Sequence, residues 1–119
     1  MRWLFENLPA SLRDEEATLK RCFEAFSRAR PVHRILLFGS HARGAPDAHS
    51  DVDLCIVADG VARQLAAARD FRRAIRHIRP KPPFTLLPIS PQRPAEKRAC
   101  GDRFFSTVLR EGVCLAEED

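Results

Sequence analysis

The stretch from Arg34 to Ala58 constrains the fold most, because it places two apolar strands around a tight turn and a pair of acids. Ile35–Phe38 is an apolar run of strand length that stops at Gly39, a residue free to adopt positive φ. Ser40 comes next, and serine favours the N-cap of a helix over the continuation of a strand. The stretch therefore predicts a strand, a turn, a short helix and a second strand, in that order.

Ten residues separate Ser40 from Asp51-Val52-Asp53, which opens the second strand. Alternation along a strand puts Asp51 and Asp53 on one face and Val52 on the other. Two neighbouring carboxylates repel each other, and a divalent cation relieves that repulsion. Mg²⁺ prefers oxygen ligands and sits between one or two carboxylates and substrate phosphates. A lone D-x-D is more often a solvated pair of surface acids, but its coupling to the Gly-Ser turn favours a metal site.

The Gly39-Ser40 turn predicts a phosphate-binding feature beside those acids. Backbone N–H groups at a turn that feeds a helix, together with a hydroxyl, suit a phosphate group. The sequence thus predicts a metal-binding site and a phosphate-binding turn at the ends of neighbouring strands.

The pattern GS-x10-D-x-D, in the form GSHARG…SDVDL, resembles the signature of the DNA polymerase β-like nucleotidyltransferases. It most resembles their minimal bacterial branch, the MNT domains that are paired with HEPN-domain proteins. The order of predicted elements over nearly the whole chain resembles that family too. The resemblance implies the polymerase β-like nucleotidyltransferase fold, an α+β architecture in which helices pack against a small mixed β-sheet.

The family's chemistry then implies a role for each matching residue. Asp51 and Asp53 would be the catalytic metal ligands for Mg²⁺, with Mn²⁺ as a substitute, and Gly39 and Ser40 would cradle the triphosphate of ATP or another nucleoside triphosphate. Arg43 would neutralise phosphate charge, or would be a loop arginine in solvent. The implied reaction is transfer of a nucleoside monophosphate, AMP in the first instance, to a protein or small acceptor. The implied partner is a HEPN-domain protein, for which this chain would act as an antitoxin, or a second copy of the chain.

Thr85 departs from the family pattern, which has a third acid at this place on the next strand. Threonine cannot replace a carboxylate as a base or as charge balance for a second cation. Three functions remain open: a working nucleotidyltransferase, a nucleotide-binding regulatory module with weakened catalysis, and a nucleic-acid-binding protein. The intact D-x-D favours the first two, so we expect no nucleic-acid partner.

Two further features have competing interpretations. His41 and His49 lie in the loop between the strands, where a histidine is usually structural but can also shuttle protons. Between Val61 and Lys81 lie seven basic residues and one acid, a surplus above the +4 of the whole chain. This stretch predicts a solvated helix face, or a surface for an acidic partner or nucleic acid.

Apolar spacing and breaker residues predict the other elements: helices over 11–29, 61–78 and 95–110, and strands over 84–89 and 113–115. Ser11 with Asp14 forms a capping box for the first helix, and Pro31 ends it. Trp3, Leu4, Phe5 and Leu8 are predicted to pack back on the domain, with a surface for a partner as the alternative.

The same spacing and breaker residues predict the buried faces of the second and third helices, the edge strand of the sheet and the end of the third helix. The second helix should bury Leu65, Ala68, Ile75 and Ile78, and the third should present Cys100, Phe104, Val108 and Leu109. Pro88 places strand 84–89 at a sheet edge, because proline donates no ladder hydrogen bond. Gly112 is placed as the C′ residue of the third helix.

Composition indicates a single globular domain over residues 1–119, with 45% hydrophobic and 30% charged residues. No apolar run approaches the roughly 20 residues that cross a bilayer, so no membrane contact is expected. The four cysteines are widely spaced without a C-x-x-C pair, which favours free thiols in a cytoplasmic protein.

Overall fold

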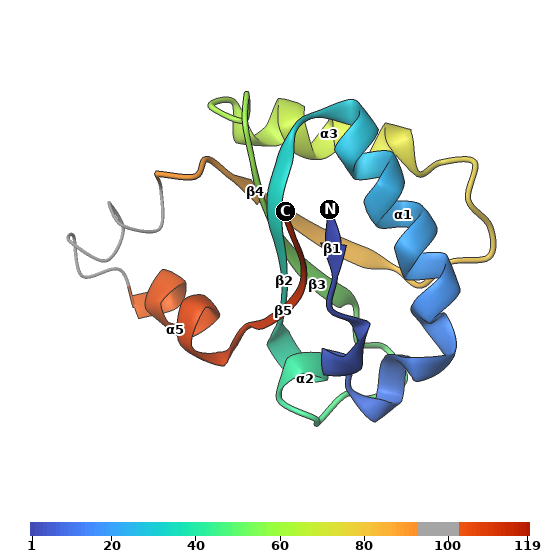
Figure 1. The fold of residues 1–119 in the computed structure, drawn as a ribbon. Helices are drawn as coiled ribbons and strands as arrows, with labels where there is room; N and C mark the ends of the chain where they lie inside the picture. Colours follow the sequence, from blue (N-terminus) through green and yellow to red (C-terminus); the bar gives the residue numbers. More distant parts are fainter. Residues whose placement is uncertain (93–102) are drawn as a thin grey trace.

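The computed structural model describes residues 1–92 and 103–119, which form one mixed sheet with helices on both faces (Figure 1). The strands are β1 (Arg2–Trp3), β2 (Val32–Phe38), β3 (Val52–Ala58), β4 (Phe84–Ile89) and β5 (Val113–Glu117). The helices are the 3-10 segments η1 (Phe5–Asn7) and η2 (Ala10–Glu15), and α1 (Glu16–Ala29), α2 (Gly39–Ala42), α3 (Gln64–Ala74) and α5 (Arg103–Glu111). The predicted α+β class is confirmed. Cys100 and the Phe104 side chain lie outside the described residues.

The strand order is β1-β5-β2-β3-β4, and among the strands of the described residues only β3 and β4 run parallel to each other. The α3 crossover joins this parallel pair, as a parallel connection requires. β4 is an edge strand, which confirms the prediction made from Pro88. The sheet therefore brings the start of β3 beside the start of β4 and beside the end of β2.

One face of the sheet packs against α1 and α3. Alternate residues of β3, such as Val52 and Leu54, join Phe23 and Phe26 of α1 and Phe71 of α3 in the larger hydrophobic core. All five side chains are at most 1% exposed. Pro31 ends α1 as predicted, since the helix stops at Ala29 and Arg30 is already extended.

The opposite face of the sheet carries a smaller core under α5. Leu36, Cys55, Val57, Ile89 and Val108 form it, and α5 lies on this side in Figure 1. By alternation, Asp53 and Thr85 point to this same face, which is the less covered one. The site residues of β3 are thus turned away from α1 and α3.

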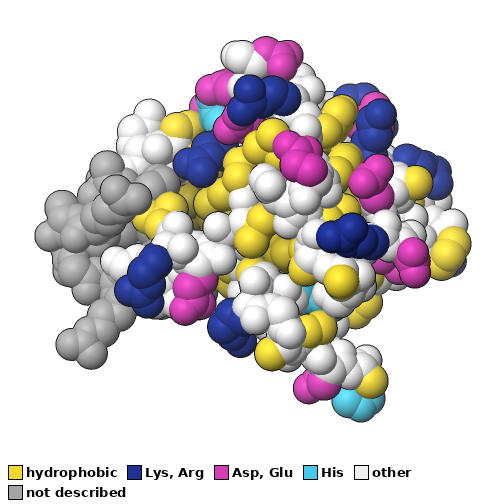
Figure 2. All heavy atoms as spheres, turned by 60° about the horizontal axis from the view of Figure 1, so that its bottom comes forward, with side chains coloured by type: hydrophobic (Ala, Val, Ile, Leu, Met, Phe, Trp, Pro, Cys, Tyr) yellow, Lys and Arg dark blue, Asp and Glu magenta, His cyan; other side chains and the backbone are white. Residues whose placement is uncertain are grey.

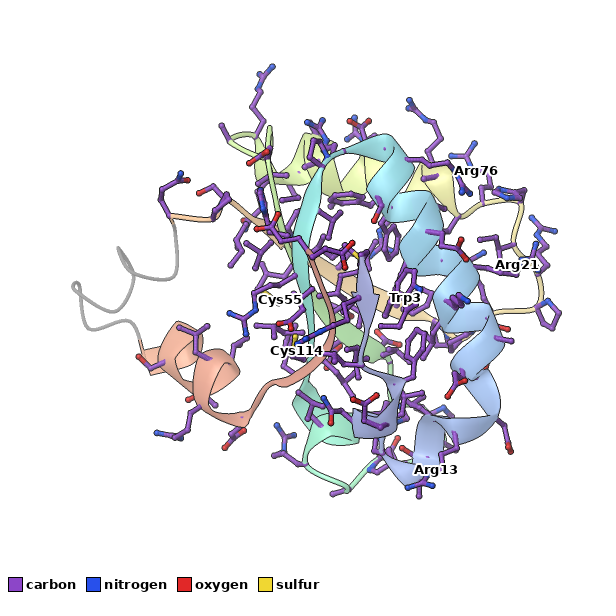
Figure 3. All side chains as sticks on the ribbon, in the orientation of Figure 1. Trp3, Arg13, Arg21, Cys55, Arg76 and Cys114 are labelled. Carbon is purple, nitrogen blue, oxygen red and sulfur yellow. The ribbon has the colours of Figure 1, made fainter. Side chains whose placement is uncertain are left out.

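The N-terminal segment packs back on the domain, as predicted. β1 pairs with β5, and Trp3 stacks on Phe5, with ring centroids 5.7 Å apart. Phe5 in turn meets Phe23 at 5.9 Å. Figure 3 shows Trp3 between β1 and α1. The aromatic contacts tie the first residues of the chain to the main core.

The predicted inner stripe of the second helix is wrong at Leu65, whose side chain is 84% exposed. The helix begins at Gln64 and its buried positions are Ala67 and Phe71, one turn apart. Ile75 continues this stripe just beyond the helix end. Leu65 precedes Ala67 by two residues, about 200° around the helix, and so faces solvent.

Three predicted caps also differ from the structure. Ser11 caps nothing, because it lies inside η2, whose N-cap Pro9 makes no side-chain bond. The N-cap of α2 is Phe38, so Ser40 lies within the helix. Gly112 follows α5 without positive φ, and its need for glycine is steric, since a Cβ there would overlap the Val108 carbonyl oxygen.

The cysteines of the described part are free thiols, as predicted: Cys22, Cys55 and Cys114. Burial raises the pKa of Cys22 to about 11 and that of Cys55 to about 12, so both stay protonated at neutral pH. None of the helices within residues 1–92 and 103–119 combines the length and the apolar character needed to cross a membrane.

Candidate active site

The two predicted carboxylates lie at the beginning of β3, facing the α5 side of the sheet. Asp51 immediately precedes the strand and is exposed, whereas Asp53 is its second residue and is half-buried. Phe38 pairs with Asp53 across the antiparallel ladder, so the strand end that carries Gly39 lies beside the acid. Asp51 is close enough for its charge to affect the ionisation of Asp53.

Gly39 makes room for Asp53. Its φ of 76° is in the left-handed region, and a Cβ added there would overlap the Asp53 Oδ2 atom. Glycine therefore serves two needs at this position: the turn conformation into α2 and the close approach of a carboxylate to the backbone. The Gly-Ser turn and the second acid of the D-x-D are one packed unit, although thirteen residues separate Gly39 from Asp53 in the chain.

Burial raises the pKa of the Asp53 carboxyl, and the neighbouring Asp51 charge raises it further. The neighbouring Thr85 hydroxyl and the charges of His41 and Arg43 oppose this shift. The balance leaves the pKa of Asp53 raised, so its ionised form is disfavoured.

Thr85 lies next to both acids. It pairs with Asp53 in the parallel β3–β4 register, and its Oγ1 donates a hydrogen bond of 3.0 Å to Asp51 Oδ2. The hydroxyl gives the acids a neutral neighbour at the place where the family resemblance puts a third carboxylate. Within the described residues, no three side chains of His, Cys, Asp or Glu are grouped to hold a metal ion.

The loop histidines have separate settings. His41 is buried, 9% exposed, and its Nδ1 lies 2.9 Å from Ser11 Oγ, so it ties η2 to α2. His49 is exposed, and its backbone N–H donates to Asp47 Oδ1. Of the two, only His41 acts on the acids, through its effect on the pKa of Asp53.

A cavity of about 290 Å³ opens beside Asp53 on the α5 side of the sheet. It is lined by Phe38, Gly39, Arg43, Asp53, Thr107, Val108 and Glu111. Figure 2, which brings the α2 end of the molecule forward, shows hydrophobic side chains gathered in the middle and charges of both signs around them. Sequence reasoning did not find Thr107 and Glu111 as site residues. Their i, i+4 spacing was the one available signal, since it places both on one face of a helix.

Residues 19–108 match the family model of the nucleotidyltransferase domain. The chain belongs to this family. The comparison with curated proteins found no match, and neither did the comparison with solved structures. The matched residues include Gly39, Ser40, Arg43, both acids and Thr85, whereas Glu111 lies beyond them.

The two carboxylates of this nucleotidyltransferase domain fit one divalent cation. Their oxygens are hard ligands, and the ionised form of Asp53 is disfavoured without a neighbouring positive charge. A Mg²⁺ ion held by the two acids would complete its coordination shell with substrate phosphates and water. The described residues do not fit a second protein-held ion, because Thr85 supplies no charge.

The basic stretch of the domain lies elsewhere. Arg69, Arg73 and Arg76 are exposed on α3 and in the turn after it, and Figure 3 shows Arg76 at the outside of the molecule. Since α3 packs on the sheet face opposite to Asp53, the sheet separates these guanidinium groups from the carboxylates.

Proposed function

We propose that this nucleotidyltransferase domain binds a nucleoside triphosphate with Mg²⁺ at Asp51 and Asp53. It transfers the nucleoside monophosphate, AMP in the first instance, to a protein or small acceptor. The observation that supports this most is the placement of Asp53 against Gly39, with Asp51 beside it and Arg43 lining the same cavity.

Each residue has a defined task in this proposal. Asp51 and Asp53 provide carboxylate oxygens, and Mg²⁺ or Mn²⁺ bound there would stabilise the charge that develops on the phosphates. Gly39 and Ser40 hold the triphosphate, and Arg43 balances its negative charge. An oxygen of the acceptor attacks the α-phosphorus, its proton passes to solvent, and the bond to the β-phosphate breaks to release pyrophosphate.

The hydrogen bond from Thr85 to Asp51 favours a second candidate function. A neutral hydroxyl beside the acids leaves nucleotide binding intact but supplies neither a base nor the charge for a second cation. The protein would then be a nucleotide-binding regulatory module that transfers slowly when alone.

The proposed partner is a HEPN-domain protein in the cytoplasm, with this chain as its antitoxin, and a second copy of the chain is the alternative. Nucleic acid is a less favoured partner, because the exposed arginines of α3 lie across the sheet from the acids.

The test combines binding with transfer. Calorimetry with MgATP on wild type and Asp53→Asn measures metal-dependent binding, and α-³²P-ATP with Mg²⁺ measures labelling of the protein or of a HEPN-domain protein encoded beside it. Binding with rapid labelling supports the transferase, and binding with very slow labelling supports the regulatory module. Equal MgATP affinity of wild type and Asp53→Asn would refute both.

A further inference from the structure

The cavity beside Asp53 has charges of opposite sign that do not pair with each other. Arg43, just after α2, and Glu111, the last residue of α5, both line it, and no ion pair joins them. Glu111 is exposed and makes no hydrogen bond or ion pair with any described residue. The cavity therefore presents the Arg43 guanidinium, whose charge acts on Asp53, and the unpaired carboxylate of Glu111 to a ligand.

The position of Glu111 is unfavourable for the fold alone. The C-terminal end of a helix carries a partial negative charge, so a carboxylate in the last turn of α5 is repelled by it. Nor does Glu111 extend the metal site, because no group of three potential ligands occurs among the described residues. Glu111 thus has no structural partner among the described residues and lies in a cavity next to the candidate active site. A ligand with hydrogen-bond donors would complement its carboxylate.

We infer that Glu111 binds the ribose hydroxyls of the nucleotide, which deepens the proposed function and rests on it. In this arrangement the triphosphate lies beside Arg43 and the metal-binding acids, and the ribose lies beside Glu111, which would repel the phosphates. The vicinal diol of a ribose offers two O–H donors to the two oxygens of a carboxylate. Phe38 and Val108 line the same cavity and supply apolar contacts for the nucleoside.

The size of the cavity agrees with this assignment. Its volume of about 290 Å³ is just below the range of about 300–1,000 Å³ for sites that take a whole drug-sized ligand. A cavity of this size suits the nucleoside part of the ligand, while the phosphates extend past Gly39 toward Asp51.

The experiment compares ATP with 2′,3′-dideoxy-ATP, each with Mg²⁺, in calorimetric titrations of the full chain. We expect wild type to bind ATP about ten- to hundredfold more tightly than 2′,3′-dideoxy-ATP, because the dideoxy nucleotide cannot donate hydrogen bonds to the charged carboxylate. Glu111→Gln should remove most of this preference by weakening ATP alone, and Glu111→Asp should keep part of it. Glu24→Gln, at an exposed position of α1, is the matched control and should behave like wild type.

The outcomes separate the two proposals. If wild type binds ATP and 2′,3′-dideoxy-ATP equally, or if Glu111→Gln keeps the preference, the ribose assignment is overturned while the proposed function stands. If wild type shows no metal-dependent binding of either nucleotide, the proposed function fails and the ribose assignment fails with it. Thermal unfolding of each variant verifies that it is folded.

Discussion

Replacing Gly39 by alanine is expected to displace the Asp53 carboxylate and to remove metal-dependent nucleotide binding. Gly39 has a φ of 76°, and an added Cβ would overlap Asp53 Oδ2 and lie 3.0 Å from Asp53 Cγ. The Asp53 Cβ would be only 3.3 Å away, so rotation of the carboxylate alone does not relieve the crowding. Either Asp53 or the turn must move.

Gly44 allows the two effects of this substitution to be separated. Its φ is 73°, but no heavy atom lies within 4 Å of an added Cβ. Left-handed φ costs an L-residue about 1–2 kcal/mol, and the stiffer unfolded chain offsets about 0.4–1 kcal/mol of that. Gly44→Ala should therefore lose about 1 kcal/mol. Gly39→Ala should lose about 1–3 kcal/mol more, the range for overpacking.

Thermal unfolding and MgATP calorimetry of the two variants test this reasoning. At roughly 4 °C per kcal/mol for a chain of this size, Gly44→Ala should lower Tm by a few degrees and Gly39→Ala by clearly more. Gly44→Ala should keep its MgATP affinity, whereas Gly39→Ala should lose at least about tenfold, because Asp53 no longer holds its position. Equal Tm values and equal affinities in the two variants would refute the steric coupling of Gly39 to Asp53.

Three other perturbations have defined outcomes. Asp53→Asn should raise the Tm of the metal-free protein at pH 7, since it removes a half-buried, repelled charge, and a lower Tm would contradict this. His33 bridges Asp59 and Glu118 at 2.9 and 2.7 Å, and hydrogen bonds to these acids raise its pKa. Protonated His33 contributes at most about 1 kcal/mol to the free energy of unfolding, because the group is partly exposed. This contribution is fully present below pH 6.5, the pKa of histidine in the unfolded chain, and is lost as pH rises through the higher pKa of His33 in the folded protein. His33→Gln should flatten that part of the profile of denaturation free energy against pH, and an unchanged profile would argue against the bridge. Thr85→Asp should raise the rate at which label is transferred from α-³²P-ATP about tenfold or more. It should also lower Tm somewhat, because it adds a third carboxylate to the site. If wild type already transfers label at an ordinary enzymatic rate, Thr85 does not limit catalysis.

The sequence determined the local elements of this site. Apolar runs and the D-x-D alternation predicted the strands on either side of Gly39, and Pro31 and Pro88 predicted a helix end and an edge strand. These features depend on backbone geometry and on the period of a strand, which act over a few residues. The resemblance of the Gly-Ser and D-x-D motifs to the nucleotidyltransferases was sufficient to predict the family.

Only the tertiary structure decided which distant residues meet. Leu65 was assigned to the core from its helical spacing to Ala68, Ile75 and Ile78, but packing against α1 buries Ala67 and Phe71 instead. Ser11 bonds His41 across the fold instead of capping its own helix. The pairing of β5 with β2 brings the end of α5, and with it Glu111, to the cavity beside Asp53. Such contacts depend on strand register and sheet order, which local patterns do not encode, since both are set by the burial of several segments at once.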